Sequence, residues 1–108
     1  MNSSTPQVLS DYFSAANDGR IDDTASCFAA DALVHDENQD RLGLDAIRTW
    51  IEHTTREYQP KTDVASIEAV EDTFVAVATV SGTFPGSPIQ LTYTFTVQNE
   101  KITGLSIR

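Results

Sequence analysis

The spacing of apolar residues predicts an amphipathic helix near the start of the chain. Its buried face would consist of Val8, Leu9, Tyr12, Phe13 and Ala16, which share one face of an α-helix. Thr5 can cap this helix and Pro6 fits its first position, because that position needs no backbone N–H donor. Gly19 can adopt the left-handed conformation that often ends a helix, so the helix should end within residues 17–19.

Two further helices are predicted before residue 60. The second is short: Asp22 or Asp23 would cap it, and it would run through about Phe28. The third should run from near Leu44 to about Tyr58, because Pro60 prevents its continuation. Its buried stripe would comprise the residues that recur every three or four positions, namely Ile47, Trp50, Ile51, Thr54 and Tyr58.

A short strand between these two helices is expected to carry a carboxylate. Asp31 should stop the second helix, and the apolar run 32–34 could be a strand or a buried helix. We favour a strand because Asp31 and the polar residues 36–40 bound the run closely, with a brief return strand at 41–43. Since side chains alternate along a strand, Val34 and Asp36 would share one face. Asp36 would then lie either at a solvated rim or in an apolar pocket with a raised pKa.

From Lys61 onward the hydrophobic period changes to two, which predicts strands at about 62–70, 73–84, 89–98 and 101–108. Turn-forming residues connect them, so the strands should form an antiparallel meander. The third of these strands alternates most clearly, with one apolar face that consists of Ile89, Leu91, Tyr93, Phe95 and Val97. The strand 73–84 is apolar on both faces at its start (Phe74, Val75, Val77), as expected for a strand covered on both sides.

This order of elements predicts an α+β cone, in which three N-terminal helices pack on a curved antiparallel sheet and enclose a pocket. The length of 108 residues suits a single domain, residues 1–108. The aromatic residues exceed what a tight small core needs, so a cavity for a small hydrophobic ligand is expected. Its lining would come from Phe13, Phe28, Val34, Trp50, Tyr58, Phe84 and Phe95.

Composition narrows the class of protein. No apolar run approaches the roughly 18 residues that a membrane span needs, and the N-terminus lacks the features of a secretory signal. We therefore expect a cytoplasmic protein with no membrane partner. Cys27 is the only cysteine, which excludes an internal disulfide and a cysteine-based zinc site and suggests a small buried hydrophobe.

Charge and histidine content argue against two kinds of ligand. The formal net charge is −9 and the seven basic residues are scattered, whereas proteins that bind nucleic acid usually carry a basic patch. His35 and His53 have no carboxylates at ligand spacing, so no metal site is predicted. His35 would alternate away from Asp36 and face an interface or the surface, and His53 would be exposed.

Three segments resemble the nuclear transport factor 2-like superfamily, and its SnoaL-like branch, named for a polyketide cyclase, most of all. They are residues 11–19 (DYFSAANDG), 28–36 (FAADALVHD) and 43–50 (GLDAIRTW). The resemblance covers nearly the whole chain and keeps the order of elements. It implies the cone-shaped fold. It also implies a set of activities that includes ketosteroid isomerases, polyketide cyclases, epoxide hydrolases and dehydratases, beside members that only bind or scaffold.

The resemblance further implies roles for three residues. Ketosteroid isomerase carries its general-base aspartate in a Val-Glu-Asp stretch after the second helix, and Val34-His35-Asp36 matches that place. Its oxyanion-hole tyrosine lies in the first helix, where Tyr12 matches. Its second donor, an aspartic acid on the penultimate strand, has no counterpart here, and Tyr93 is the nearest candidate. The acid that polyketide cyclases carry toward their C-terminal strands is also unmatched, because Glu100 lies in a turn.

Two functions follow from these residues. The first is a cofactor-independent enzyme of the isomerase, cyclase or dehydratase kind, acting on a hydrophobic carbonyl compound. Asp36 would remove a carbon-bound proton, and the hydroxyls of Tyr12 and Tyr93 would stabilise the enolate oxygen. The alternative is a non-catalytic module that binds a hydrophobic ligand or dimerises. The threonine-rich outer face of the meander, through which superfamily members commonly dimerise, predicts a homodimer in either case.

Overall fold

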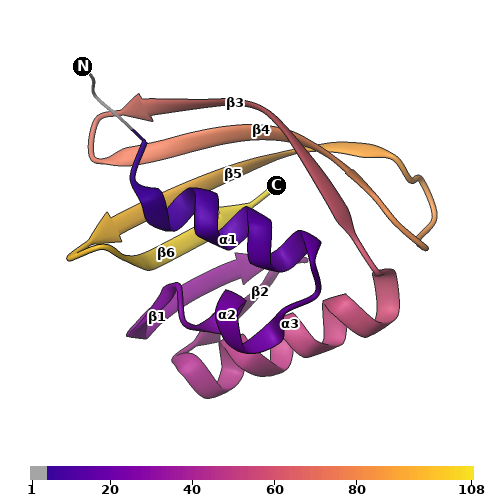
Figure 1. Ribbon diagram of the computed structural model, residues 1–108, viewed down its shortest axis with the longest axis horizontal. Coiled ribbons are helices and arrows are strands. Elements are labelled where there is room, and N and C mark those ends of the chain that lie inside the picture. Colours follow the sequence, from indigo (N-terminus) through magenta and orange to yellow (C-terminus); the bar gives the residue numbers. More distant parts are fainter. Residues whose placement is uncertain (1–4) are drawn as a thin grey trace.

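A computed structural model of the protein describes residues 5–108 as three helices and a six-stranded curved sheet (Figure 1). The helices are α1 (Gln7–Asn17), α2 (Ile21–Ala25) and α3 (Leu44–Tyr58). The strands are β1 (Phe28–Asp36), β2 (Gln39–Leu42), β3 (Lys61–Val70), β4 (Thr73–Ser81), β5 (Ile89–Gln98) and β6 (Lys101–Ile107). The predicted α+β arrangement is therefore confirmed.

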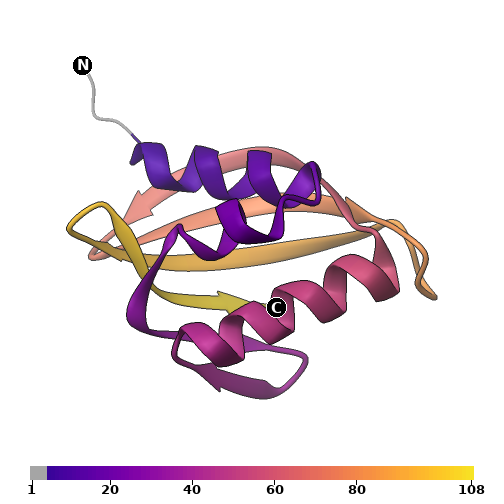
Figure 2. The ribbon, with the colours of Figure 1, turned by 60° about the horizontal axis from the view of Figure 1, so that its bottom comes forward.

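The sheet order is β2-β1-β6-β5-β4-β3, and the meander from β3 to β6 is antiparallel, as predicted. The pairing of β1 with β6 is parallel and joins the two halves of the chain. Figures 1 and 2 show the long strands bending around the helices. The inner face of β5 alternates as expected, because Tyr93 and Phe95 are buried and Leu91 and Val97 pack against the core.

The N-terminal boundaries differ from the prediction. Pro6 has extended backbone angles (φ −58°, ψ 139°), so α1 begins at Gln7 and Thr5 does not cap it. The α2 helix ends at Ala25, no aspartate side chain caps it, and Phe28 already belongs to β1. Asp31 consequently lies within a strand and does not stop a helix. The reason is tertiary, because Phe28 is buried and pairs with Ile102 of β6.

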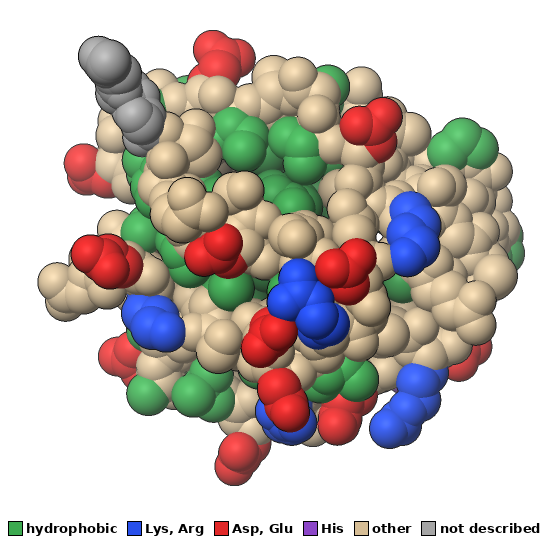
Figure 3. Space-filling view, in the orientation of Figure 1, with side chains coloured by type: hydrophobic (Ala, Val, Ile, Leu, Met, Phe, Trp, Pro, Cys, Tyr) green, Lys and Arg blue, Asp and Glu red, His purple; other side chains and the backbone are tan. Residues whose placement is uncertain are grey.

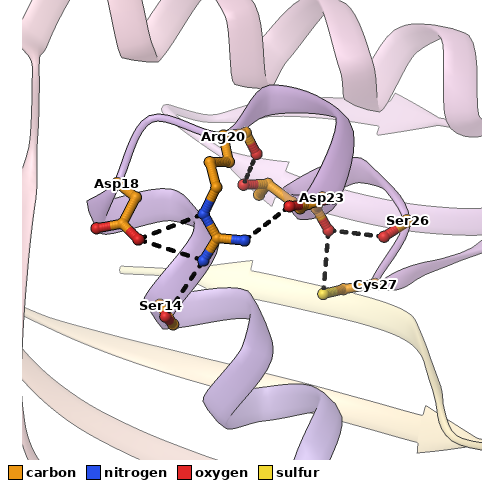
Figure 4. Close-up of polar contacts among 7 residues, drawn as sticks. Ser14, Asp18, Arg20, Asp23, Ser26 and Cys27 are labelled. Carbon is orange, nitrogen blue, oxygen red and sulfur yellow. Dashed lines mark hydrogen bonds and ion pairs between the residues drawn. The ribbon is translucent and has the colours of Figure 1, made fainter.

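The joint between α1 and α2 is held by Arg20 (Figure 4). Its guanidinium lies 2.7 Å from the Asp23 carboxylate and 3.3 Å from that of Asp18, and it also donates to the Ser14 hydroxyl. Because these charged side chains are exposed, the contacts contribute little to stability. Their main effect is to orient the turn between the two helices. Cys27 is buried in the turn that follows, as predicted, and burial raises the pKa of its thiol.

The second hairpin also departs from the prediction. The β4 strand ends at Ser81, and residues 82–88 form a loop in which the Gly82 N–H donates to the Ser87 hydroxyl. Thr83 ties this loop to the end of α3, since its N–H donates to the Tyr58 carbonyl at 2.7 Å. On β4, the inner Ala76, Ala78 and Val80 are buried, whereas the outer Val75 and Val77 remain half-exposed. The expectation of cover on both faces was wrong, because the helices lie on one face.

The hydrophobic core fills the space between the helices and the inner face of the sheet. Its largest fully buried side chains are Phe95, Leu9, Ile47, Ile102 and Val34. Figure 3 shows further hydrophobic side chains gathered between α1 and the β3–β4 hairpin. Ile67 of β3 and Phe74 of β4 are partly buried and pack against the core. None of the helices described is long and apolar enough to cross a membrane.

Candidate active site

A cavity of about 630 Å³ opens between α3, the end of α1 and the inner face of the sheet. Its volume is within the range of sites that bind small organic molecules. The wall is mainly apolar, and its charged side chains are Asp36, Glu37 and Arg108. The residues that line it include Tyr12, Ala16, Thr24, His35, Asp36, Glu37, Asn38, Trp50, Ile51, Thr54, Thr55, Tyr58, Pro60, Thr62, Val80, Phe84, Pro85, Ile89, Leu91, Tyr93, Ile107 and Arg108.

Asp36 ends β1 and lies in the cavity wall. Val34, two residues earlier on the same face, is fully buried, so strand alternation directs the Asp36 carboxylate inward. The indole N–H of Trp50, on α3, donates to Asp36 Oδ2 at 3.0 Å. Burial raises the pKa of the Asp36 carboxyl, while the Trp50 hydrogen bond and the positive charge of Arg41 oppose that rise. The result is a half-buried carboxylate held in one orientation with a raised pKa.

Tyr12 brings a phenol to the same cavity from α1. Its side chain is only 6% exposed and packs edge-on against Phe13, Phe28 and Phe95. Within residues 5–108, its hydroxyl forms no hydrogen bond. Burial, together with the nearby Tyr93 and Asp36, raises the pKa of the Tyr12 phenol. Tyr12 is therefore a protonated donor that faces the cavity and has no acceptor among the described residues.

Tyr93 supplies a second phenol from β5. It is buried on the inner face and stacks on Phe95, with ring centroids 6.2 Å apart. Burial raises the pKa of the Tyr93 phenol, the Thr62 side chain partly offsets the rise, and Asp36 adds to it. Tyr12, Tyr93 and Asp36, the three predicted catalytic residues, all line this one cavity.

The predicted lining residues divide into two groups. Trp50, Tyr58 and Phe84 lie on the cavity wall. Phe13, Phe28, Val34 and Phe95 instead lie in the core behind it, each at most 6% exposed. Phe13 and Phe28 pack edge-on against Tyr12 and Phe95 stacks on Tyr93, so these three rings lie behind the wall. Val34 is fully buried in the core. Aliphatic residues of the wall, such as Val80 and Leu91, were missed, although Leu91 shares the face of Tyr93.

Sequence reasoning also missed two polar contacts of the site. One is the bond from Trp50 to Asp36, for which the signal was a buried indole that needs an acceptor. The other joins Tyr58 to Glu37, whose carboxylate oxygen lies 3.0 Å from the phenol oxygen.

His35 is half-buried, and its Nδ1 lies 2.7 Å from Asp40 of β2. Within residues 5–108, no three His, Cys, Asp or Glu side chains cluster as metal ligands.

Comparisons with known proteins agree with this geometry. The sequence profile of the SnoaL-like domain matches residues 9–105. A crystal structure of a proposed polyketide cyclase from Sinorhizobium meliloti is 33% identical, with a TM-score of 0.92, over 96% of this chain and 95% of that one. Comparison with curated proteins gives no match.

Two more distant structures share the fold alone. An NTF2-like protein from Cytophaga hutchinsonii has a TM-score of 0.81 at 13% identity, over 100% of this chain and 93% of that one. A protein with a ketosteroid isomerase-like fold from Catenulispora acidiphila, in complex with trimethylamine, has a TM-score of 0.84 at 18% identity. That alignment covers 97% of this chain and 86% of the other. The nuclear transport factor 2-like fold implied by the sequence is thereby confirmed.

Proposed function

Because the chain belongs to the SnoaL-like domain family, we propose that it is a small-molecule enzyme that removes a carbon-bound proton beside a carbonyl group. Asp36 acts as the general base, and Tyr12 and Tyr93 donate hydrogen bonds to the substrate oxygen. The substrate is a hydrophobic carbonyl compound that fits a cavity of about 630 Å³. The observation that carries this proposal is a half-buried carboxylate with a raised pKa that lines the same cavity as a buried phenol, which has no protein acceptor among residues 5–108.

The proposed reaction starts with proton transfer from the substrate α-carbon to Asp36. The electron pair of the broken C–H bond moves onto the carbonyl oxygen and forms an enolate, which the phenols stabilise. A base with a raised pKa is better matched to a weakly acidic carbon, and phenols with raised pKa stay protonated at neutral pH. The enolate can then take the proton back at another carbon, expel a β-leaving group or attack a second carbonyl.

The similar Sinorhizobium meliloti protein supports the last of these outcomes. It is described as a proposed polyketide cyclase, and closing a ring by joining an α-carbon to a carbonyl carbon of the same molecule requires an enolate. The apolar walls supplied by Val80, Phe84 and Leu91 would hold the carbon skeleton of such a substrate. We therefore place polyketide-like ketones beside isomerisable enones as the first compounds to test.

Hydrogen–deuterium exchange into the substrate tests the proposal directly. Apolar ketones, including a β,γ-unsaturated steroid ketone, a tetralone and an aromatic β-diketone, are incubated with the protein in D₂O, and mass spectrometry follows deuterium uptake. We expect the wild type to accelerate exchange and Asp36→Asn to lose on the order of 10²-fold or more. Tyr12→Phe should also lose on the order of 10²-fold. Asp40→Asn, an exposed carboxylate, is the control, and equal exchange in Asp36→Asn and the wild type would refute the role of Asp36.

The second candidate is a binding or dimerisation module of the same fold. The outer face of the sheet favours it, because Val75 and Val77 are half-exposed beside the uncharged Thr92 and Thr94. We propose that this face joins two copies of the chain in a two-fold homodimer, whether or not the cavity is catalytic. A ketone that raises the melting temperature without any deuterium uptake would favour the module.

A further inference from the structure

One hydrogen bond crosses the solvent-facing part of the cavity wall. The Tyr58 hydroxyl, at the end of α3, donates to Glu37 Oε2 in the turn between β1 and β2, at 3.0 Å. Both residues line the cavity, Tyr58 is half-buried and the Glu37 side chain is 41% exposed. The bond therefore lies where the cavity meets solvent, and it joins two residues that are 21 positions apart in the chain.

The conformation of the β1–β2 turn directs Glu37 toward the cavity. In a continued strand, Glu37 would point away from the face that Asp36 occupies. Glu37 and Asn38 instead both adopt the left-handed conformation (φ 57° and 60°), which is typical of a two-residue hairpin turn. Asp36 and Glu37 consequently both line the cavity, and Arg41 Nη2 lies 3.6 Å from the Glu37 carboxylate.

Tyr58 connects this turn to the loop 82–88. Its ring packs edge-on against Phe84, with ring centroids 5.8 Å apart. Thr83 anchors the loop to the same helix end, because its N–H donates to the Tyr58 carbonyl and its hydroxyl donates to the Glu57 carbonyl. With the loop and the helix end fixed together, the Tyr58–Glu37 hydrogen bond joins them to the β1–β2 turn.

We propose that Tyr58 and Glu37 form a gate that controls access to the Asp36–Trp50 end of the cavity. A bond between an exposed carboxylate and a phenol competes with water, so it opens readily. Opening it leaves the Tyr58 ring on Phe84 and the backbone anchors of the loop in place. A ligand that enters past this bond reaches the wall where Trp50 holds Asp36. The inference concerns access to the cavity and holds whether or not the proposed catalysis does.

Dynamic quenching of Trp50 by acrylamide tests the gate without a ligand. Trp50 is the only tryptophan, it lies on the cavity wall and it is 6% exposed. Time-resolved fluorescence gives the bimolecular rate at which acrylamide reaches it. Tyr58→Phe keeps the ring against Phe84 and removes only the hydroxyl, whereas Glu37→Ala removes the acceptor. Glu57→Gln, a neutralised neighbour whose side chain is outside the gate, is the matched control.

We expect the quenching rate to rise at least twofold in Tyr58→Phe and in Glu37→Ala. The double variant should rise no further, because each change opens the same bond. Glu57→Gln should quench as the wild type does. An unchanged rate in Tyr58→Phe would overturn the gate, and so would an equal rise in Glu57→Gln. Melting temperatures of all variants are measured alongside, and a rise in quenching that tracks loss of stability in every variant also counts against it.

Discussion

Replacing Trp50 by phenylalanine should raise the pKa of Asp36 above its already raised wild-type value. The indole N–H of Trp50 donates to Asp36 Oδ2 at 3.0 Å, and this bond favours the charged carboxylate. Phenylalanine keeps an aromatic ring on the wall but has no donor. Burial, the largest cause of the raised pKa, would then act with less opposition, since Arg41 and the Glu37 backbone would be the remaining groups that lower it.

The size of the change follows from the geometry. A hydrogen bond to a charged group contributes about 1.5–3 kcal/mol when the group is well buried. Asp36 is only half-buried and opens onto the cavity, so screening reduces the value to about 1 kcal/mol. At about 1.36 kcal/mol per pH unit, the pKa of Asp36 should rise by about 0.7 in Trp50→Phe relative to the wild type.

Carboxyl-carbon NMR titration measures this change in protein labelled at aspartate, with Asp36→Asn to assign the signal. Phe84→Leu is the control, because it alters an aromatic wall residue that donates no hydrogen bond to Asp36. We expect the control to titrate as the wild type does. A pKa of Asp36 that stays the same or falls in Trp50→Phe would refute the claim that the indole stabilises the carboxylate.

Three further predictions use other parts of the structure. The pKa of Asp36 is raised in the folded state. The stability that its protonated form contributes is therefore fully present below the unfolded pKa of about 3.9 and is lost as pH rises through the folded pKa. Asp36→Asn should therefore match or exceed the wild-type free energy of unfolding at pH 7, with a smaller difference near pH 4. The exposed Asp31→Asn on the same strand is the control, and a loss of more than about 1 kcal/mol in Asp36→Asn contradicts the argument. Sedimentation equilibrium at micromolar concentration should give twice the chain mass of 11.8 kDa. Val77→Glu on the outer face should give the monomer, whereas a monomeric wild type rejects the dimer. Phe95→Ala, at a fully buried position, should lower the free energy of unfolding by about 3–5 kcal/mol in urea titration, and a loss under about 1 kcal/mol would contradict its place in the core.

The elements with strong local signals were predicted closely. The α3 helix spans Leu44–Tyr58 as expected, because Pro60 prevents its continuation and its apolar stripe is regular. The strands of the meander start and end within three residues of the prediction, since alternation is a local property. The segment 26–31 was misread because its conformation depends on β6, which pairs with Phe28 from more than seventy residues away.

The site shows the same division between local and distant causes. Alternation from Val34 and along β5 placed Asp36 and Tyr93 on the inner face. Nothing local indicates that α3 brings Trp50 against Asp36, because that contact depends on how the helix crosses the sheet. Strand alternation predicts that Glu37 points outward, and only the left-handed turn directs it to the cavity.

Three features of the cavity each cost the fold stability, and they coincide. A cavity of about 630 Å³ leaves its walls without packing partners on one side. The Tyr12 hydroxyl is buried, and within residues 5–108 it has no hydrogen-bond partner, which is unfavourable compared with phenylalanine. The Asp36 carboxyl is held where its charged form is disfavoured. A domain that served only as a scaffold would gain stability from filling or neutralising each of them. Local rules of stability are broken together mainly at functional sites, so their coincidence favours a cavity that binds and acts on a ligand over an inert one.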